Sequence, residues 1–130
     1  MRTSLARRRN VTPIEHDEQV MLIRWTRLAT VAHPELDLLY AIPNGGERNK
    51  IIAAKLKAEG VRKGVPDLHL PVPRAGYCGL YVEMKRRKGG VVSEEQRVWI
   101  ARLAEQGHRV EVCKGWEQAR DVIVSYLAAA

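Results

Sequence analysis

Two short segments of the chain place carboxylates and a lysine where they could form a metal site. Asp67 follows a proline, and the run Glu83-Met84-Lys85 comes a short hairpin's length further on. Two carboxylates that converge repel each other unless a cation lies between them, and Mg2+ is a hard ion that prefers oxygen ligands. A lysine beside such an ion can orient or help to deprotonate a water, or stabilise charge on a phosphate. These residue types favour metal-dependent hydrolysis, with Mg2+ as the expected ion and Mn2+ as its substitute.

The convergence of these residues depends on two predicted strands. Residues 67–70 and 79–85 are rich in apolar side chains and are separated by a turn that contains proline and glycine. Because side chains alternate along a strand, Glu83 and Lys85 share one face. If the two strands pair as a hairpin, Asp67 and Glu83 converge at one end of the sheet. The alternative is an exposed ion pair of Glu83 with Lys85 on a strand surface.

The remaining segments predict alternating helices and strands. Helices are expected over 15–31, 47–59, 93–106 and 116–127, and further strands over 38–42 and 108–113. Ser93 and Gln96 have the capping-box spacing at the start of the third helix, and Gly60 suits the end of the second. This order is typical of an α/β fold with a mixed central β-sheet flanked by helices.

The composition fits one domain that binds a polyanion. The chain has 130 residues and carries 22 Lys and Arg against 15 Asp and Glu, which gives a net charge of +7. A basic balance of this kind favours nucleic acid as the partner. Residues 1–12 contain four arginines and no acid, so we expect a flexible basic arm there and a single domain over residues 13–130.

Cysteine use and hydropathy argue against several other classes of protein. Cys78 and Cys113 have no CxxC spacing and no histidine cluster nearby, so neither a disulfide framework nor a zinc site is indicated. No apolar run approaches the length of a transmembrane helix, and the N-terminal segment lacks the apolar centre of a secretory signal. We therefore expect a cytoplasmic protein without a membrane partner.

The motif resembles a known nuclease signature. Asp67 and the run Glu83-Met84-Lys85 match the PD-(D/E)XK pattern, and the flanking segments are similar to its VRR-NUC (virus-type replication-repair nuclease) branch. Those segments are Glu15 with Gln19 on the first helix, then IPNGG, GVRKGVPDL, YVEMK and SEEQ. The resemblance spans most of the chain, from Glu15 to about Leu127. It implies a restriction-endonuclease-like core and a Mg2+-dependent DNA endonuclease, of the small stand-alone type found mostly in phages and bacteria.

The resemblance also implies roles for individual residues at the metal site. Asp67 and Glu83 would bind the divalent ion, and the backbone carbonyl of Met84 would supply a third ligand. Lys85 would position or activate the attacking water. These roles agree with the chemistry that the residue types favour by themselves.

Two further residues are implied around that site. Gln96 resembles the glutamine that supports the active site in the family, and it also suits the capping box of its own helix. Glu15 matches the carboxylate that the family carries on its N-terminal helix. Glu18 stays open as the alternative, because it lies closer to the middle of the apolar arc of that helix.

Basic residues flank the predicted catalytic strands and are candidates for phosphate contacts. They are Arg62, Lys63, Arg86, Arg87 and Lys88. Asn44, which precedes two glycines, is a further candidate for contact with DNA. The alternative is a solvated loop surface that binds nothing.

The resemblance implies branched DNA as the substrate. Stand-alone members resemble Holliday-junction resolvases, and two symmetric cuts require two active sites under one two-fold axis, so a homodimer is expected. The enzymatic alternative is a monomer that cuts flaps or nicks duplexes. Two alternatives from other classes are a non-catalytic DNA-binding protein on a nuclease fold and a small α/β protein with a structural charge cluster. The presence of Asp67, Glu83 and Lys85 together favours an enzyme.

Overall fold

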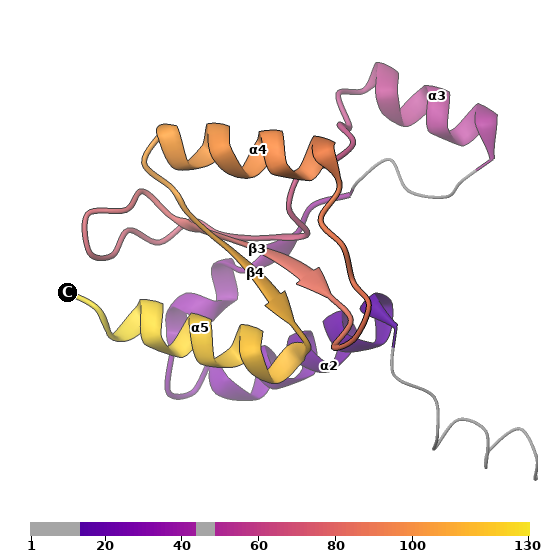
Figure 1. Ribbon diagram of the computed structural model, residues 1–130. Coiled ribbons are helices and arrows are strands. Elements are labelled where there is room, and N and C mark those ends of the chain that lie inside the picture. Colours follow the sequence, from indigo (N-terminus) through magenta and orange to yellow (C-terminus); the bar gives the residue numbers. More distant parts are fainter. Residues whose placement is uncertain (1–13, 44–48) are drawn as a thin grey trace, which may run out of the picture.

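Alternating apolar side chains build a four-stranded mixed sheet in the order β1-β2-β3-β4 (Figure 1). The computed structural model describes residues 14–43 and 49–130, so the expected basic arm over 1–12 and Asn44 lie outside the described residues. The elements are α2 (Glu15–Ala29), the 3-10 helix η1 (Pro34–Leu38), β1 (Tyr40–Ala41), α3 (Lys50–Ala58), β2 (Leu68–Leu70), β3 (Leu80–Lys85), α4 (Glu94–Glu105), β4 (Arg109–Lys114) and α5 (Trp116–Ala128). The predicted α/β class with helices flanking a mixed sheet is confirmed.

The pairing of the strands confirms the predicted hairpin. β2 and β3 are antiparallel, with Leu68 opposite Val82 and His69 opposite Tyr81. β1 adds to the other edge of β2 in antiparallel register, and β3 pairs with β4 in parallel along its whole length. Continued by one pair, the β2–β3 register places Asp67 opposite Glu83 at the end of the hairpin.

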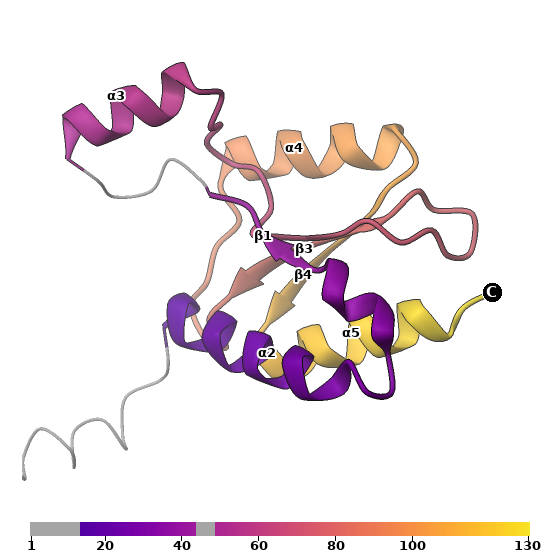
Figure 2. The same ribbon diagram turned by 180° about the vertical axis from the view of Figure 1, so that it is seen from behind.

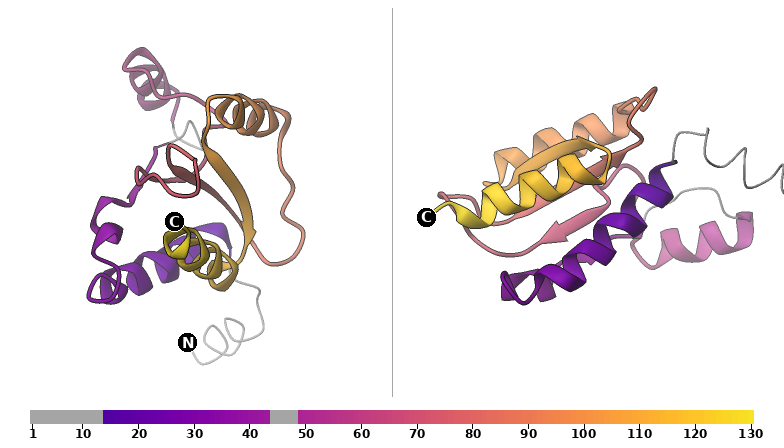
Figure 3. Two further views of the ribbon diagram at one scale, coloured as in Figure 1. Left: turned by 90° about the vertical axis from the view of Figure 1, so that its left-hand side faces the viewer. Right: turned by 90° about the horizontal axis from the view of Figure 1, so that it is seen from below.

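One face of the sheet carries the hydrophobic core. Leu68, Val82, Met84 and Cys113 are buried there in one cluster with residues of α2 and α5, and the two helices lie together on that side of the sheet (Figure 3). α4 lies on the opposite side, where its principal strand contact is β4 (Figure 2). Because side chains alternate along β3, Glu83 points to the side of α4.

The segment before β1 differs from the prediction of a strand over 38–42. Residues Pro34–Leu38 form a 3-10 helix with Pro34 in its first turn, and the strand is limited to Tyr40–Ala41. Proline fixes φ near the helical value, which favours a helical turn directly after His33. That turn places Leu36 in the core at 4% exposure. The segment thus buries one leucine through a helical turn and does not form a long strand.

The helix caps agree with the sequence pattern. Ser93 and Gln96 form the complete capping box at the start of α4. Asn49 caps α3, where its side chain accepts a hydrogen bond from the backbone of Ile52. α3 projects away from the sheet (Figure 1), and none of its residues is buried. Within residues 14–43 and 49–130, no helix has the length and apolar character needed to cross a membrane.

Candidate active site

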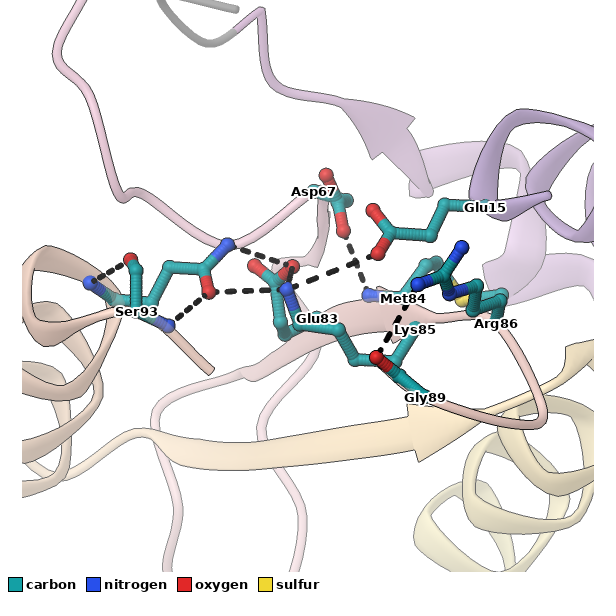
Figure 4. Close-up of polar contacts among 9 residues, drawn as sticks. Glu15, Asp67, Glu83, Met84, Lys85, Arg86, Gly89 and Ser93 are labelled. Carbon is teal, nitrogen blue, oxygen red and sulfur yellow. Dashed lines mark hydrogen bonds and ion pairs between the residues drawn. The ribbon is translucent and has the colours of Figure 1, made fainter. Parts of the chain in front are cut away.

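Asp67 and Glu83 meet at the end of the β2–β3 hairpin (Figure 4). Asp67 Oδ2 accepts a hydrogen bond of 2.6 Å from the backbone amide of Met84, which fixes its carboxylate beside β3. The loop before Asp67 lies against α4 at Gly64, which has a φ of +93° and where a Cβ would fall 2.8 Å from the backbone of Glu95. A side chain at this position would push the loop away from α4, so glycine helps to place Asp67.

The electrostatics of this pair fit a divalent cation. Glu83 is 2% exposed, and burial, followed by the neighbouring Asp67 carboxylate, raises its pKa from 4.5 to about 9. Lys85 offsets part of this rise. A dication would allow both carboxylates to stay ionised at neutral pH, because its charge compensates for desolvation and mutual repulsion.

The backbone of β3 provides a third oxygen. The Lys85 carbonyl accepts a hydrogen bond from Gly115, on the side of β4. Successive carbonyls point to opposite sides of a strand, so the Met84 carbonyl points to the side of Asp67. Among the described residues, no three His, Cys, Asp or Glu side chains are grouped to hold a metal ion. Two carboxylates and one backbone carbonyl could hold a hard cation that keeps several water ligands.

Lys85 is a buried lysine held between three partners. Its side chain is 6% exposed, and Nζ lies 3.6 Å from Glu83 Oε2 and 3.9 Å from Glu15 Oε1. Nζ also donates a hydrogen bond of 3.0 Å to Gln96 Oε1. These partners fix the ammonium group beside the carboxylate pair.

Gln96 makes the contacts that each of the two roles left open by the sequence would require. Its Oε1 accepts a 2.8 Å hydrogen bond from the backbone of Ser93, which completes the capping box of α4. The same oxygen accepts from Lys85, and Nε2 donates to Glu83 Oε2 at 3.2 Å. One amide therefore connects the start of α4 to Glu83 and Lys85 of β3.

The geometry distinguishes Glu15 from Glu18. Glu15 is at the N-terminus of α2, where its half-exposed side chain reaches Lys85. Glu18 is completely buried, and it accepts hydrogen bonds from the Trp116 backbone at 3.0 Å and from Arg87 Nε at 3.1 Å. Glu15 therefore lies at the site, whereas Glu18 connects α2 to α5 and to the loop after β3.

Comparison with known proteins agrees with this geometry. A family model described as the VRR-NUC domain matches residues 14–117. The chain belongs to the VRR-NUC family. A solved structure described as a VRR_NUC domain protein is similar over 90% of each chain, with a TM-score of 0.72 and 25% sequence identity. No curated protein sequence matches the chain. The VRR-NUC domain is a nuclease domain of the PD-(D/E)XK type, so the resemblance noted in the sequence is confirmed.

The basic residues of this VRR-NUC domain have different surroundings. Arg86 and Lys88 are exposed on the loop after β3, and Arg86 Nη2 donates to the Gly89 carbonyl at 3.3 Å. Arg87 is paired with both Glu18 and Glu117. The charge of Arg87 is therefore largely compensated within the protein.

The other basic cluster lies between α3 and α4. The Arg62 guanidinium stacks on the ring of Trp99, 5.4 Å from its centroid. Lys63 Nζ lies 4.0 Å from a carboxylate oxygen of Glu95, and both side chains are mostly exposed. An exposed pair of this kind contributes little to stability, so Lys63 remains available to a phosphate.

A cleft beside Glu15 was not expected from the sequence. It has a volume of about 470 Å³ and is lined by Ile14, Glu15, His16, Arg86, Gly89, Gly90 and Val91. Gly90 packs directly on β3, because a Cβ there would lie 3.0 Å from Lys85 Cβ. The Gly89-Gly90 pair is the signal in the sequence that could have indicated this close approach.

Proposed function

We propose that this VRR-NUC domain is a structure-selective DNA endonuclease that hydrolyses phosphodiester bonds with Mg2+, for which Mn2+ can substitute. Asp67, Glu83 and the Met84 carbonyl would hold the ion. The observation that carries the proposal is the position of Lys85 Nζ, 3.6 Å from Glu83 and hydrogen-bonded to Gln96 at 3.0 Å. A binding protein would gain nothing from a buried lysine fixed beside two convergent carboxylates.

The residues of the chain divide the work of hydrolysis. When bound, the metal ion would polarise the phosphate and lower the pKa of a water. Lys85 is oriented to hold the attacking water, or a non-bridging phosphate oxygen, as negative charge develops on the phosphate. Gln96 holds the Lys85 and Glu83 side chains in fixed positions relative to each other. Glu15 limits the movement of the Lys85 ammonium group from the other side.

DNA contacts are proposed for the exposed basic residues around this site. The two strands that carry Asp67, Glu83 and Lys85 are flanked in the sequence by four such residues: Arg62, Lys63, Arg86 and Lys88. Asn44, which comes before all of them in the sequence, is a further candidate. Contacts of this type supply sequence-independent affinity that falls as salt rises. Arg87, which is paired with two carboxylates, would contribute to DNA binding mainly by shaping the loop that carries Arg86 and Lys88.

The preferred substrate is proposed to be a four-way junction cut by a homodimer. Each chain has one set of Asp67, Glu83 and Lys85, so two symmetric cuts within one complex require two chains. Exposed apolar side chains on the projecting helix α3 support a contact with a second copy, since Ile51 is 72% and Ile52 44% exposed. A monomer would instead favour flaps or nicked duplexes.

A cleavage panel tests the proposed function. Labelled four-way junctions, flaps, single strands and duplexes are incubated with Mg2+, with Mn2+ or with excess EDTA, and light scattering gives the mass of the free and DNA-bound protein. Symmetric cuts in the junction by two chains per complex would support the resolvase. A mass near 14.7 kDa with one chain per junction would support the monomeric flap or nicking nuclease, and undiminished cleavage in EDTA would exclude the metal site.

A further inference from the structure

A row of rings crosses three strands beside the active site. Tyr40 on β1 is opposite His69 on β2, and His69 is opposite Tyr81 on β3. The rings of His69 and Tyr81 are stacked, with centroids 4.1 Å apart and planes 5° from parallel. Tyr40 meets His69 nearly edge-on at 5.3 Å, and its hydroxyl lies 2.7 Å from His69 Nδ1. These contacts hold the three side chains, here called the ring row, in a fixed arrangement.

The ring row lies on the same face of the sheet as the catalytic carboxylates. His69 is two residues from Asp67 along the chain, and Tyr81 is two residues from Glu83 along β3. Side chains separated by two residues on a strand share a face and are about 7 Å apart. The next position on this face is Gly79, where a Cβ would lie 3.4 Å from His69 Nε2. The absence of a side chain there leaves room for the imidazole.

The ring row is partly open to solvent. Tyr40 is 50% exposed, and His69 and Tyr81 are intermediate between buried and exposed. α4 packs on this side of the sheet mainly against β4, which is at the opposite edge from β1 (Figure 2). The mechanism of hydrolysis uses none of these rings. Exposed aromatic area beside a site is typical of surfaces that contact a ligand.

His69 and Tyr81 stack on each other and Tyr81 also meets His108 nearly edge-on, so Tyr40 is the ring that the row offers to a ligand. We infer that the ring row, through the exposed ring of Tyr40, binds an unpaired nucleobase of the DNA substrate, next to the phosphate held at Asp67 and Glu83. The inference rests on the proposed nuclease function and names the feature of DNA that the same site selects. Consecutive nucleotides of a strand rise about 3.4 Å. A platform about 7 Å from the carboxylates therefore meets a nucleotide one or two positions from the phosphate that is cut.

Ring stacking selects DNA by its structure rather than by its sequence. Every base has a π-face, so an aromatic platform accepts any of the four bases. A base within a duplex already stacks on its neighbours and is not available to a protein ring unless it leaves the helix. The ring row therefore favours branch points, where nucleotides are unpaired, over continuous duplex DNA.

Binding measurements on the full chain test this inference. The Asp67→Asn chain, which should bind without cutting, is titrated into fluorescein-labelled duplex that carries a short single-stranded flap, the same flap with abasic nucleotides, and blunt duplex. We expect Tyr40→Ala in this chain to weaken flap binding on the order of tenfold and to change blunt-duplex binding less than twofold. Tyr40→Phe, which keeps the ring, should retain flap binding. Abasic nucleotides should weaken binding of the parent chain to the level of Tyr40→Ala.

Tyr77 provides a matched control. It is 41% exposed, close to the value for Tyr40, but it lies in the turn at the far end of the β2–β3 hairpin. Tyr77→Ala should leave binding of all three DNAs unchanged. A Tyr40→Ala loss that is equal for flap and blunt duplex, or flap binding that does not depend on the bases, would overturn the inference.

Two further outcomes distinguish base binding by the ring row from a contact between copies of the chain and from the nuclease proposal itself. If Tyr40→Ala changes the mass of the protein in light scattering without changing base-dependent flap binding, the ring row is a contact between copies of the chain and the inference fails. If the wild-type chain, with Asp67 intact, cuts no DNA with Mg2+ or Mn2+, the nuclease proposal fails, whereas base-dependent flap binding by the Asp67→Asn chain would still show the platform. The failure of one is therefore distinguishable from the failure of the other.

Discussion

Gln96 Oε1 accepts a hydrogen bond from Lys85 Nζ at 3.0 Å, so a residue that caps a helix also fixes a buried lysine of the neighbouring strand. Its Nε2 donates to Glu83 at 3.2 Å. The amide thereby orients both side chains, and rotation of the amide would break contacts to both. Gln96 therefore couples the stability of the α4 start to the geometry of the site, whereas Ser93 acts only in the cap, so variants of the two residues separate these properties.

Gln96→Ala should lower cleavage by about tenfold or more, since Lys85 and Glu83 lose a common partner. Ser93→Ala is the matched control, because it removes only the other half of the capping box. Each variant should lose about 1 kcal/mol of folding stability, but Ser93→Ala should retain nearly full cleavage at a temperature where it is folded. Equal cleavage by both variants would show that Gln96 acts only as a cap.

Asp67→Asn and Lys85→Ala should each reduce cleavage by about a hundredfold or more. DNA binding should survive in both, because the exposed basic residues supply most of the affinity. Gel-shift and cleavage assays on the same preparations provide the measurement. Cleavage near the wild-type rate in either variant would refute the role given to that residue.

Stability without metal should decrease as pH rises. The pKa of Glu83 is about 9 in the folded protein against an ordinary value of 4.5, so the folded state binds this proton more tightly than the unfolded state. The contribution is complete below pH 4.5 and is lost as pH rises through about 9. Thermal unfolding in EDTA across this range checks the direction.

Glu83→Gln should remove that pH dependence. At pH 8 in EDTA its unfolding temperature should exceed that of the wild-type chain by roughly 3 °C or more, since glutamine is neutral in both states, whereas Glu83 must stay protonated in the folded protein at a pH where it ionises in the unfolded chain. Added Mg2+ should stabilise the wild-type chain and not the variant. A wild-type chain that gains no stability from Mg2+ or Mn2+ would contradict the metal site at Glu83.

Substitution of Glu18 should affect stability and substitution of Glu15 should affect cleavage, although both residues lie in the first turn of α2. Glu18→Ala should cost about 2–3 kcal/mol of stability, less than for a fully buried pair because Arg87 is 47% exposed. Glu15→Ala should change stability by less than about 0.5 kcal/mol and should lower cleavage. Chemical denaturation and cleavage assays of the two variants measure this contrast, and the reverse pattern would assign the site to Glu18.

Arg86 and Arg87 form a second matched pair of neighbours. Arg86→Ala should weaken DNA binding and reduce the slope of affinity against salt by about 1. Arg87→Ala should instead lower the unfolding temperature, because it leaves Glu18 buried without its cation. Binding titrations at several salt concentrations distinguish the two, and equal salt slopes for both variants would argue against the separate roles.

Features that depend on neighbouring residues could be predicted from the amino-acid sequence. Strand alternation placed Glu83 and Lys85 on one face, and the short turn made β2 and β3 a hairpin that brings Asp67 to Glu83. The spacing of Ser93 and Gln96 defined the start of α4. Such features follow from backbone periodicity and local hydrogen bonds, which act over a few residues and are visible in the order of the side chains.

The contacts between distant segments could not be predicted from the sequence, because they depend on how the helices and strands pack. The choice of Glu15 over Glu18 at the site depends on the packing of α2 against β3 and α5, and the partners of Arg87 come from two different helices. The ring row joins Tyr40 to His69, which is 29 positions away in the sequence. Contacts of this kind depend on how helices and strands pack against each other and on which side chains are buried in that packing. The residues involved are far apart in the sequence, so no local pattern predicts them.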